Sequence, residues 1–217
     1  MDTNVNIEHS PLVLIPFKPY PLGKTRLKKA LASEEQVIRV QKSLIDNVIR
    51  TIDSLMLIKN TVIITPLLEK LEKMISLDKY PFLSVIAQQP EEVTSKSLGE
   101  QISEIVCDLE IFPVILVMSD LVNLRPSTIK AVHALLKEYD GVIVPTNDKG
   151  TGILGFNEKL CDHLNFFGKN SSEKFFEVWD QLVGLKIARF IQQPELIDVD
   201  TEDDLKLLKW DFLAKPE

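Results

Sequence analysis

The stretch "LVLIPFKPYPLGKTRLKKAL", residues 12–31, joins an apolar run to a loop rich in lysine and arginine. Its first six residues have the length and composition of a strand that is buried on both faces. The loop that follows contains Gly23-Lys24-Thr25, the end of the phosphate-binding loop of many ATPases and GTPases. A buried strand followed by a basic loop is typical of nucleotide-binding α/β proteins, so the same alternation of strands and helices is expected further along the chain.

Short apolar runs do alternate with longer amphipathic segments. The clearest helix is 33–52, where apolar residues recur at helical spacing and Ser33 with Gln36 has the pattern of a capping box. Further strands are predicted at 61–65, 82–87, 113–120, 141–145, 151–156 and 186–192, and further helices at 66–77, 97–109, 125–139, 171–183 and 201–213. This order predicts an α/β fold with a mostly parallel sheet, in one domain over residues 1–217. Residues 1–10 are polar and are predicted to be a loose arm.

The composition is that of a globular protein, with 45% hydrophobic and 26% charged residues. A net charge of −7 argues against a nucleic-acid-binding protein, but a few local basic side chains can still bind a small anion. The N-terminus lacks the pattern of a signal peptide and no apolar run is long enough to span a membrane, so a cytoplasmic protein without membrane contact is expected. Cys107 and Cys161 have no metal-binding spacing and are interpreted as reduced structural cysteines.

The basic loop does not fit a P-loop. A P-loop has a glycine five positions before the glycine of Gly-Lys-Thr, and Lys18 stands there instead. Pro19 and Pro21 also lack the N–H groups that a P-loop points at phosphates. Side-chain charge from Lys18, Lys24 and Arg26 could bind phosphates in another way, since ammonium and guanidinium groups both suit them. The alternative is a solvated basic turn that leads into a helix.

Three aspartates form a candidate metal site. Asp120 ends the apolar strand PVILVMSD, where a charge must reach solvent, pair or bind a cation. Asp198 and Asp200 lie two residues apart and share a face if this segment is extended. Three convergent carboxylates suit Mg²⁺, which prefers oxygen ligands. For the acids at 198–204, helix capping is the alternative, because Thr201 and Asp204 have the pattern of a capping box.

These segments together resemble a known family, the guanylyltransferases that activate 2-phospho-L-lactate, or phosphoenolpyruvate in related enzymes, in coenzyme F420 biosynthesis. The resembling segments run through the chain in order: IPFKPYPLGKTRL, PVILVMSDLVNLRPSTI, KGTGILGF, FFGKNSSEKF and PELIDVDTEDDL. The family belongs to the GT-A-like nucleotidyltransferases. The resemblance therefore implies a Rossmann-like nucleotide-diphospho-sugar transferase (GT-A) fold, with a mixed, mostly parallel sheet and helices on both faces.

The resemblance also implies a reaction and a set of site residues. GTP and a small phosphorylated acid would be the ligands, Mg²⁺ the cofactor, and a homodimer stays open. Lys24, Arg26 and Asp120 would be catalytic. The implied nucleotide and phosphate contacts are Lys18, Lys24, Thr25, Arg26, Ser97 and Leu98. The implied acceptor contacts are Thr151, Gly168 and Ser171, and the implied metal ligands are Asp120, Asp198 and Asp200.

The chain departs from the family pattern at three loops. Val122 replaces a proline of Asp-Leu-Pro-Leu, Gly152 replaces the asparagine of Gly-Gly-Thr-Asn, and Gly99 stands where relatives carry the asparagine of a Gly-Leu-Asn-like segment. The metal and phosphate segments thus match better than the segments that choose acceptor and base. Two alternatives follow: a nucleotidyltransferase with another phosphorylated acceptor, or a nucleotide-binding homologue without catalysis.

Overall fold

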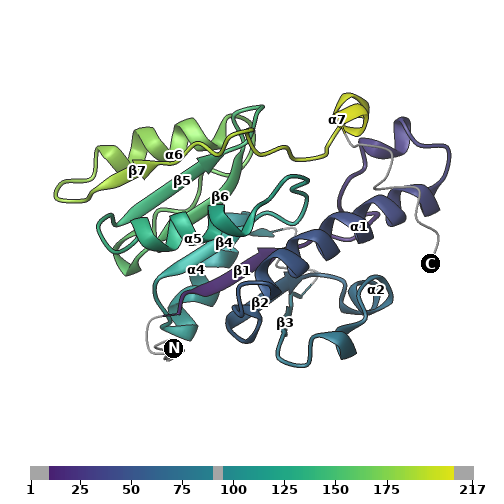
Figure 1. Cartoon of the computed structure of the whole chain (residues 1–217), viewed down its shortest axis with the longest axis horizontal. Helices are drawn as coiled ribbons and strands as arrows, with labels where there is room; N and C mark the ends of the chain where they lie inside the picture. Colours follow the sequence, from purple (N-terminus) through teal and green to yellow (C-terminus); the bar gives the residue numbers. More distant parts are fainter. Residues whose placement is uncertain (1–9, 90–94, 208–217) are drawn as a thin grey trace, which may run out of the picture.

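The computed structural model of the chain describes residues 10–89 and 95–207 and contains a seven-stranded sheet (Figure 1). The strand order is β3-β2-β1-β4-β6-β5-β7. The strands are β1 (Leu12–Pro16), β2 (Thr61–Thr65), β3 (Ser84–Ala87), β4 (Val114–Val117), β5 (Gly141–Pro145), β6 (Thr151–Phe156) and β7 (Ile187–Arg189). Strand β6 runs antiparallel to β4 and β5, and the other neighbours pair in parallel. The predicted mixed, mostly parallel sheet is confirmed.

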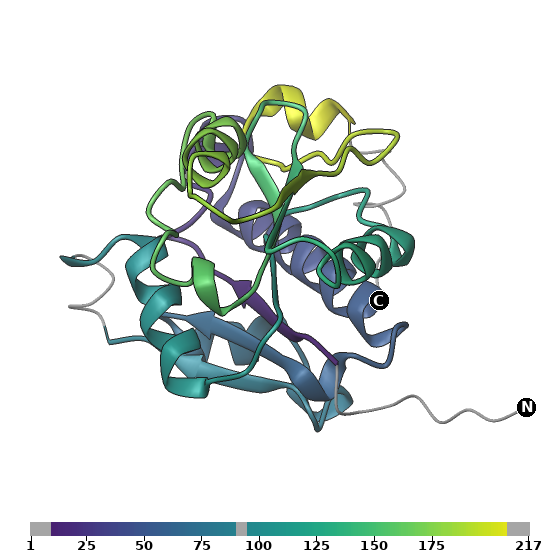
Figure 2. The ribbon, with the colours of Figure 1, turned by 90° about the vertical axis from the view of Figure 1, so that its left-hand side faces the viewer.

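Helices cover both faces of the sheet, as predicted (Figure 2). They are α1 (Glu34–Asp53), α2 (Leu68–Met74), α4 (Leu98–Leu109), α5 (Pro126–Leu135) and α6 (Ser171–Asp180), while α7 (Glu202–Leu207) packs near the loop after β1. Because side chains alternate along a strand, Val13 and Ile15 of β1 face the core shared with α1, α2 and α5. Leu12 and Leu14 face the second core, shared with α4 and α6. No helix in the described ranges is long and apolar enough to cross a lipid bilayer.

The predicted elements are present, with shorter ends. Strand β4 stops at Val117 and β7 at Arg189, although strands were predicted to 120 and 192. Half of the predicted capping box of α1 forms: the Gln36 amide donates to the Ser33 hydroxyl, while the Gln36 side chain accepts from the Ala32 amide. Nearly all of the predicted arm at 1–10, and the part of the predicted helix 201–213 beyond 207, lie outside the described residues.

The fold brings three distant segments to one edge of the sheet. Strands β1 and β4 are adjacent and parallel, so the loops after them begin at the same edge. The segment before α7 joins them there through an isolated bridge between Leu121 and Asp198. The Val199 amide also donates to the Asp120 carbonyl oxygen at 3.3 Å. Parallel pairing of β1 and β4 thus places the basic loop beside Asp120, and the antiparallel bridge at Leu121 adds the segment of Asp198 and Asp200.

Candidate nucleotide and metal site

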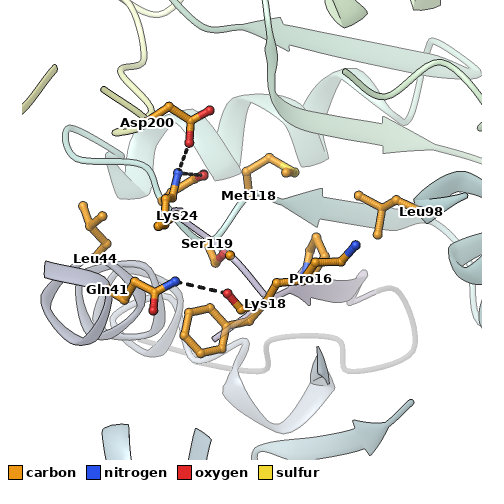
Figure 3. Close-up of a pocket in the computed structure, with 12 residues that line it drawn as sticks. Pro16, Lys18, Lys24, Gln41, Leu44, Leu98, Met118, Ser119 and Asp200 are labelled. Atoms are coloured by element: carbon orange, nitrogen blue, oxygen red, sulfur yellow. Dashed lines mark hydrogen bonds and ion pairs between the residues drawn. The ribbon is translucent and has the colours of Figure 1, made fainter. Parts of the chain in front are cut away.

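Hydrogen bonds within its own backbone and to α1 fix the conformation of the loop after β1. The amides of Leu22 and Gly23 both donate to the carbonyl oxygen of Pro19, at 2.9 and 3.2 Å. Buried Gln41 of α1 accepts from the Tyr20 amide at 2.8 Å and donates to the Lys18 carbonyl oxygen at 3.1 Å (Figure 3). The amides of Tyr20, Leu22 and Gly23 are therefore already bonded within the loop or to α1, which agrees with the rejection of a P-loop.

A tight turn at Gly23 and Lys24 sends the Lys24 side chain toward β4. A Cβ atom at Gly23 would lie 2.0 Å from the Lys18 carbonyl oxygen, so only glycine fits there. Lys24 has a φ of 59°, a left-handed conformation that costs a residue with a side chain roughly 1–2 kcal/mol. Such backbone strain persists where surrounding contacts fix the residue, and it is common at functional sites.

The contacts that fix Lys24 are two ion pairs. Its Nζ atom lies 2.5 Å from Oδ2 of Asp120 and 2.5 Å from Oδ1 of Asp200 (Figure 3). The Lys24 side chain is only 10% exposed. Burial by itself lowers the pKa of Lys24, but the charges and hydrogen bonds of Asp120 and Asp200 outweigh burial and raise it. Lys24 is therefore a firmly charged cation between the two carboxylates.

Asp198 adds a third carboxylate beside this pair. Burial, followed by the charges of Asp120, Asp148 and Asp200, raises the pKa of Asp198 to about 7. Asn123 holds the backbone of this segment: its side chain accepts from the Ile197 amide at 3.0 Å and donates to a nearby carbonyl oxygen. The four aspartates carry more negative charge than Lys24 alone can neutralise, so the site attracts further cations.

The predicted metal ligands fit a cation such as Mg²⁺ in their chemistry. One carboxylate oxygen of Asp120, Oδ1, is buried without a hydrogen-bond partner, which is costly unless a ligand supplies one. The carboxylate oxygens of the three aspartates do not all lie within 4.8 Å of one another. Among the described residues, three ligand atoms come that close only at Cys107, Cys161 and Asp162. In this arrangement Lys24 stands between two of the three aspartates.

A pocket of about 230 Å³ opens beside the Lys24 ion pairs. Five predicted site residues line it: Lys18, Lys24, Leu98, Asp120 and Asp200. The other lining residues are Pro16, Phe17, Gly23, Gln41, Leu44, Met118 and Ser119. The sequence did hold a signal for one of them. Gln41 is a polar residue on the apolar stripe of helix 33–52, a position where a buried amide usually has a defined partner.

The remaining predicted residues do not line this pocket. Thr25 and Arg26 are exposed next to it in sequence, and Ser97 caps α4 through a full capping box with Glu100. The predicted acceptor residues form a separate group. Buried Thr151 and Ser171 hydrogen-bond to each other through their hydroxyl groups at 2.9 Å.

The acceptor group also includes a turn at Gly168. Gly168 has a φ of 125°, which favours glycine, and its carbonyl oxygen accepts from the Ser171 amide at 3.1 Å. The structure thus gathers the predicted acceptor residues at the start of α6, apart from the pocket that holds Lys24.

Known proteins share both this fold and its sequence pattern. A curated 2-phospho-L-lactate guanylyltransferase from Methanocaldococcus sp. (strain FS406-22) is 26% identical over 89% of this chain and 78% of its own. A solved candidate nucleotide-diphospho-sugar transferase from Desulfovibrio desulfuricans G20 has a TM-score of 0.68 at 20% identity, over 90% of this chain and 84% of its own. A solved cytidylyltransferase from Leptospira borgpetersenii (serovar Hardjo-bovis, strain JB197) has a TM-score of 0.61 at 12% identity, over 96% of this chain and 88% of its own.

These structural likenesses agree with the expected nucleotidyltransferase fold. The sequence itself decides the family. The family model described as "Guanylyl transferase CofC like" matches residues 12–209, which is most of the chain. The chain therefore belongs to the CofC-like guanylyl transferase family.

Proposed function

We propose that this chain transfers GMP from GTP to 2-phospho-L-lactate or phosphoenolpyruvate, with release of pyrophosphate, in coenzyme F420 biosynthesis. The observation that carries the proposal is the buried Lys24 ammonium, 2.5 Å from both Asp120 and Asp200 in the pocket beyond β1 and β4. A cation and acids at this edge of a parallel sheet suit a nucleoside triphosphate. The family and the curated relatives support the acceptor.

In this reaction an oxygen of the acceptor phosphate forms a bond to the α-phosphorus of GTP, and the bond from that phosphorus to the bridging oxygen of pyrophosphate breaks. A phosphate monoester has a second pKa near ~6, so the nucleophile is already an anion at neutral pH. No side chain has to remove a proton. The protein contributes alignment and neutralisation of charge, which are the main needs of phosphoryl-type transfers.

The basic residues of the loop would meet the triphosphate. Lys24 and Lys18 line the pocket, so their charges can face phosphate oxygens there. Arg26 is exposed two residues after Lys24, and its guanidinium suits the departing pyrophosphate. Asp120, Asp198 and Asp200 would hold Mg²⁺, which when bound neutralises charge on the reacting phosphate. Leu98 and Met118 offer an apolar wall to the base.

One observation favours the alternative of a different phosphorylated acid as the acceptor. At Gly152, where relatives carry asparagine, an added Cβ would lie 2.7 Å from Cδ1 of Leu196 and 3.2 Å from Cγ2 of Thr146. Leu196 and Thr146 thus fill the space that an asparagine side chain would need at position 152. The polar group that relatives could offer to the acceptor is absent here. Thr151, Gly168 and Ser171 remain as the proposed contacts to the acceptor.

The test is pyrophosphate release from GTP and Mg²⁺, without an acceptor and with 2-phospholactate, phosphoenolpyruvate or a panel of other phosphorylated acids. We expect release that depends on one acceptor and falls at least about a hundredfold in Asp120→Asn, the size expected when an electrostatic contact to the reacting phosphate is lost. Asp180→Asn, at the exposed end of α6, is the matched control and should keep full activity.

The other outcomes separate the alternatives. Release with an acceptor outside the two named acids would support a related nucleotidyltransferase. GTP binding without release would support a homologue that has lost catalysis. Retained turnover in Asp120→Asn, within about threefold, would remove Asp120 from the proposed site. The cytoplasmic location and the homodimer stay predictions, to be tested by cell fractionation and by the mass of the protein in solution.

A further inference from the structure

A second group of metal-binding side chains lies on the α4 side of the sheet. Cys107 is in the last turn of α4, and Cys161 with Asp162 follows the short 3₁₀ helix after β6, η5 (Glu158–Leu160). The two Sγ atoms are 3.5 Å apart. These sulfur atoms and a carboxylate oxygen of Asp162 all lie within 4.8 Å of one another. Residues 54 positions apart therefore present three ligand atoms to one point.

The surroundings of this group are acidic. Cys107 and Cys161 line a hollow of about 430 Å³ together with Glu110, Glu158 and Phe112. Within the part of the chain that the structure describes, Glu110, Glu158 and Asp162 form no ion pair with a basic side chain. Negative charge without a basic partner, next to two sulfur atoms, favours a cation.

The group is separate from the proposed nucleotide site. Leu98, at the first turn of α4, lines the nucleotide pocket, whereas Cys107 lies nine residues further along the helix. At 1.5 Å of rise per residue this is roughly 14 Å. Neither the pocket lining nor the Lys24 ion pairs include a residue of the cysteine group. An ion bound here would connect α4 to the segment after β6.

We propose that Cys107, Cys161 and Asp162 form a binding site for a soft divalent cation of the Zn²⁺ class. Thiolate and carboxylate ligands of this kind suit Zn²⁺. Two sulfur atoms bonded to one tetrahedral Zn²⁺, each at about 2.3 Å, lie roughly 3.8 Å apart, close to the separation seen here. Three protein ligands leave a fourth position for water or for one of the glutamates that line the hollow.

A disulfide between the same cysteines is the competing interpretation. It requires the sulfur atoms to approach to about 2.05 Å and an oxidant such as a small-molecule disulfide. Thiol–disulfide exchange proceeds through a thiolate, and neighbouring carboxylates disfavour that form in the absence of a cation. A bound cation reverses this balance, because coordination deprotonates the thiol. The charges around the pair therefore favour the metal.

Titration with Co²⁺ tests the proposal, since sulfur bonded to Co²⁺ gives a near-ultraviolet charge-transfer band that carboxylates alone do not give. The reduced, full-length protein should bind one Co²⁺ with this band, and Zn²⁺ should remove it. Cys107→Ser should abolish the band while the protein stays folded, because Cys107 is exposed. Asp162→Asn should weaken binding by at least the ~10–100-fold that loss of an outer-shell partner costs, because Asp162 is a direct ligand. Asp108→Asn, an exposed neighbour of Cys107, is the matched control and should bind normally.

Several results would overturn the proposal. Among them are no band in the wild-type protein, or an equal band in Cys107→Ser. Zn²⁺ binding that is lost in Asp120→Asn but kept in Cys107→Ser would also overturn it, because the ion would then occupy the aspartate site. The chain has only two cysteines, so intact mass also tests for a disulfide directly. A loss of two hydrogens in protein purified under reducing conditions would favour the disulfide instead. GTP turnover should be unchanged in Cys107→Ser, so this test stands apart from the proposed function.

Discussion

The two halves of the proposed active site differ in how they match the family pattern. In the phosphate half, Lys24, Asp120 and Asp200 come from three segments and meet at 2.5 Å. In the acceptor and base half, the chain departs from the pattern at Gly99 and Gly152, and neighbouring atoms fill the space beside both glycines. A Cβ at Gly99 would lie 2.1 Å from the Leu164 carbonyl oxygen, and one at Gly152 would lie 2.7 Å from Leu196. Ion pairs between side chains determine the structure of the phosphate half, and close packing against glycines determines that of the acceptor and base half.

The largest expected effect is in the phosphate half. Lys24→Gln removes the cation between Asp120 and Asp200 and leaves two carboxylates in a partly buried site. We expect kcat/KM for GTP to fall by about 10²–10³, the usual loss when one electrostatic contact to the reacting group is removed. Steady-state pyrophosphate release measures it.

Lys29→Gln is the matched control for this substitution. Lys29 is an exposed lysine of the same loop, so its loss should leave kcat/KM nearly unchanged. If both variants lost activity equally, the loop would act through its overall charge. The phosphate half would then not depend on the specific ion pairs of Lys24 with Asp120 and Asp200.

The second prediction restores the family residue in the acceptor half. Gly152→Asn should lower the free energy of unfolding by about 1–3 kcal/mol, because the new side chain overlaps Leu196 in a filled site. Leu196→Ala opens this space, so the double variant should lose less stability than the sum of the two single variants. Urea unfolding of the four proteins measures this coupling.

Gly184→Asn is the control for the change of residue type. Gly184 has a φ of 81° and nothing within 4 Å of an added Cβ, and asparagine tolerates that conformation better than most residues do. Its cost should be well below that of Gly152→Asn. An equal cost at both positions would show that backbone freedom, and not packing against Leu196, explains Gly152.

The sequence predicted much of this fold because alternating apolar and amphipathic runs determine elements and their order. It also predicted that Asp120 would lie near Asp198 and Asp200, from the spacing of the last two and from the family resemblance, and the structure joins these segments through the isolated bridge between Leu121 and Asp198. The sequence could not show that Lys24 pairs with the acids. That contact depends on a left-handed turn at a residue other than glycine. Nor could it show that Cys107 approaches Cys161, because their distance along the chain carries no spacing signal.

The third prediction concerns the proposed acceptor contacts. Ser171→Ala removes the hydrogen bond to Thr151, which should reduce stability by about 1 kcal/mol. If Ser171 also binds the acceptor, KM for the acceptor should rise about tenfold, equal to ~1.4 kcal/mol of lost binding, while KM for GTP stays constant. Ser172→Ala is a close control. Ser172 is buried and donates to the Lys149 carbonyl oxygen at 2.8 Å, so it should lose similar stability with no change in KM.

The last prediction is a pH dependence of stability, and it returns to the phosphate half. Burial and the neighbouring aspartates raise the pKa of Asp198 from its ordinary 3.8 to about 7. Between these values the folded chain keeps a proton that the unfolded chain releases. The free energy of unfolding of the metal-free protein should therefore fall as pH rises through this interval and become level above it. Asp198→Asn removes the titrating group and should flatten this part of the curve.

Mg²⁺ and a second aspartate sharpen the test. A bound cation favours the charged carboxylate, so saturating Mg²⁺ should reduce the slope in the wild-type protein but not in Asp198→Asn. At Asp203, a hydrogen bond from Lys206 lowers the pKa, so any contribution should have the opposite sign and be lost as pH falls. Urea midpoints between about pH 3 and 8, with chelator and with Mg²⁺, measure both contributions. Equal slopes in the wild-type protein and Asp198→Asn would mean that Asp198 stays charged, with Lys24 alone already balancing the acids of the phosphate half.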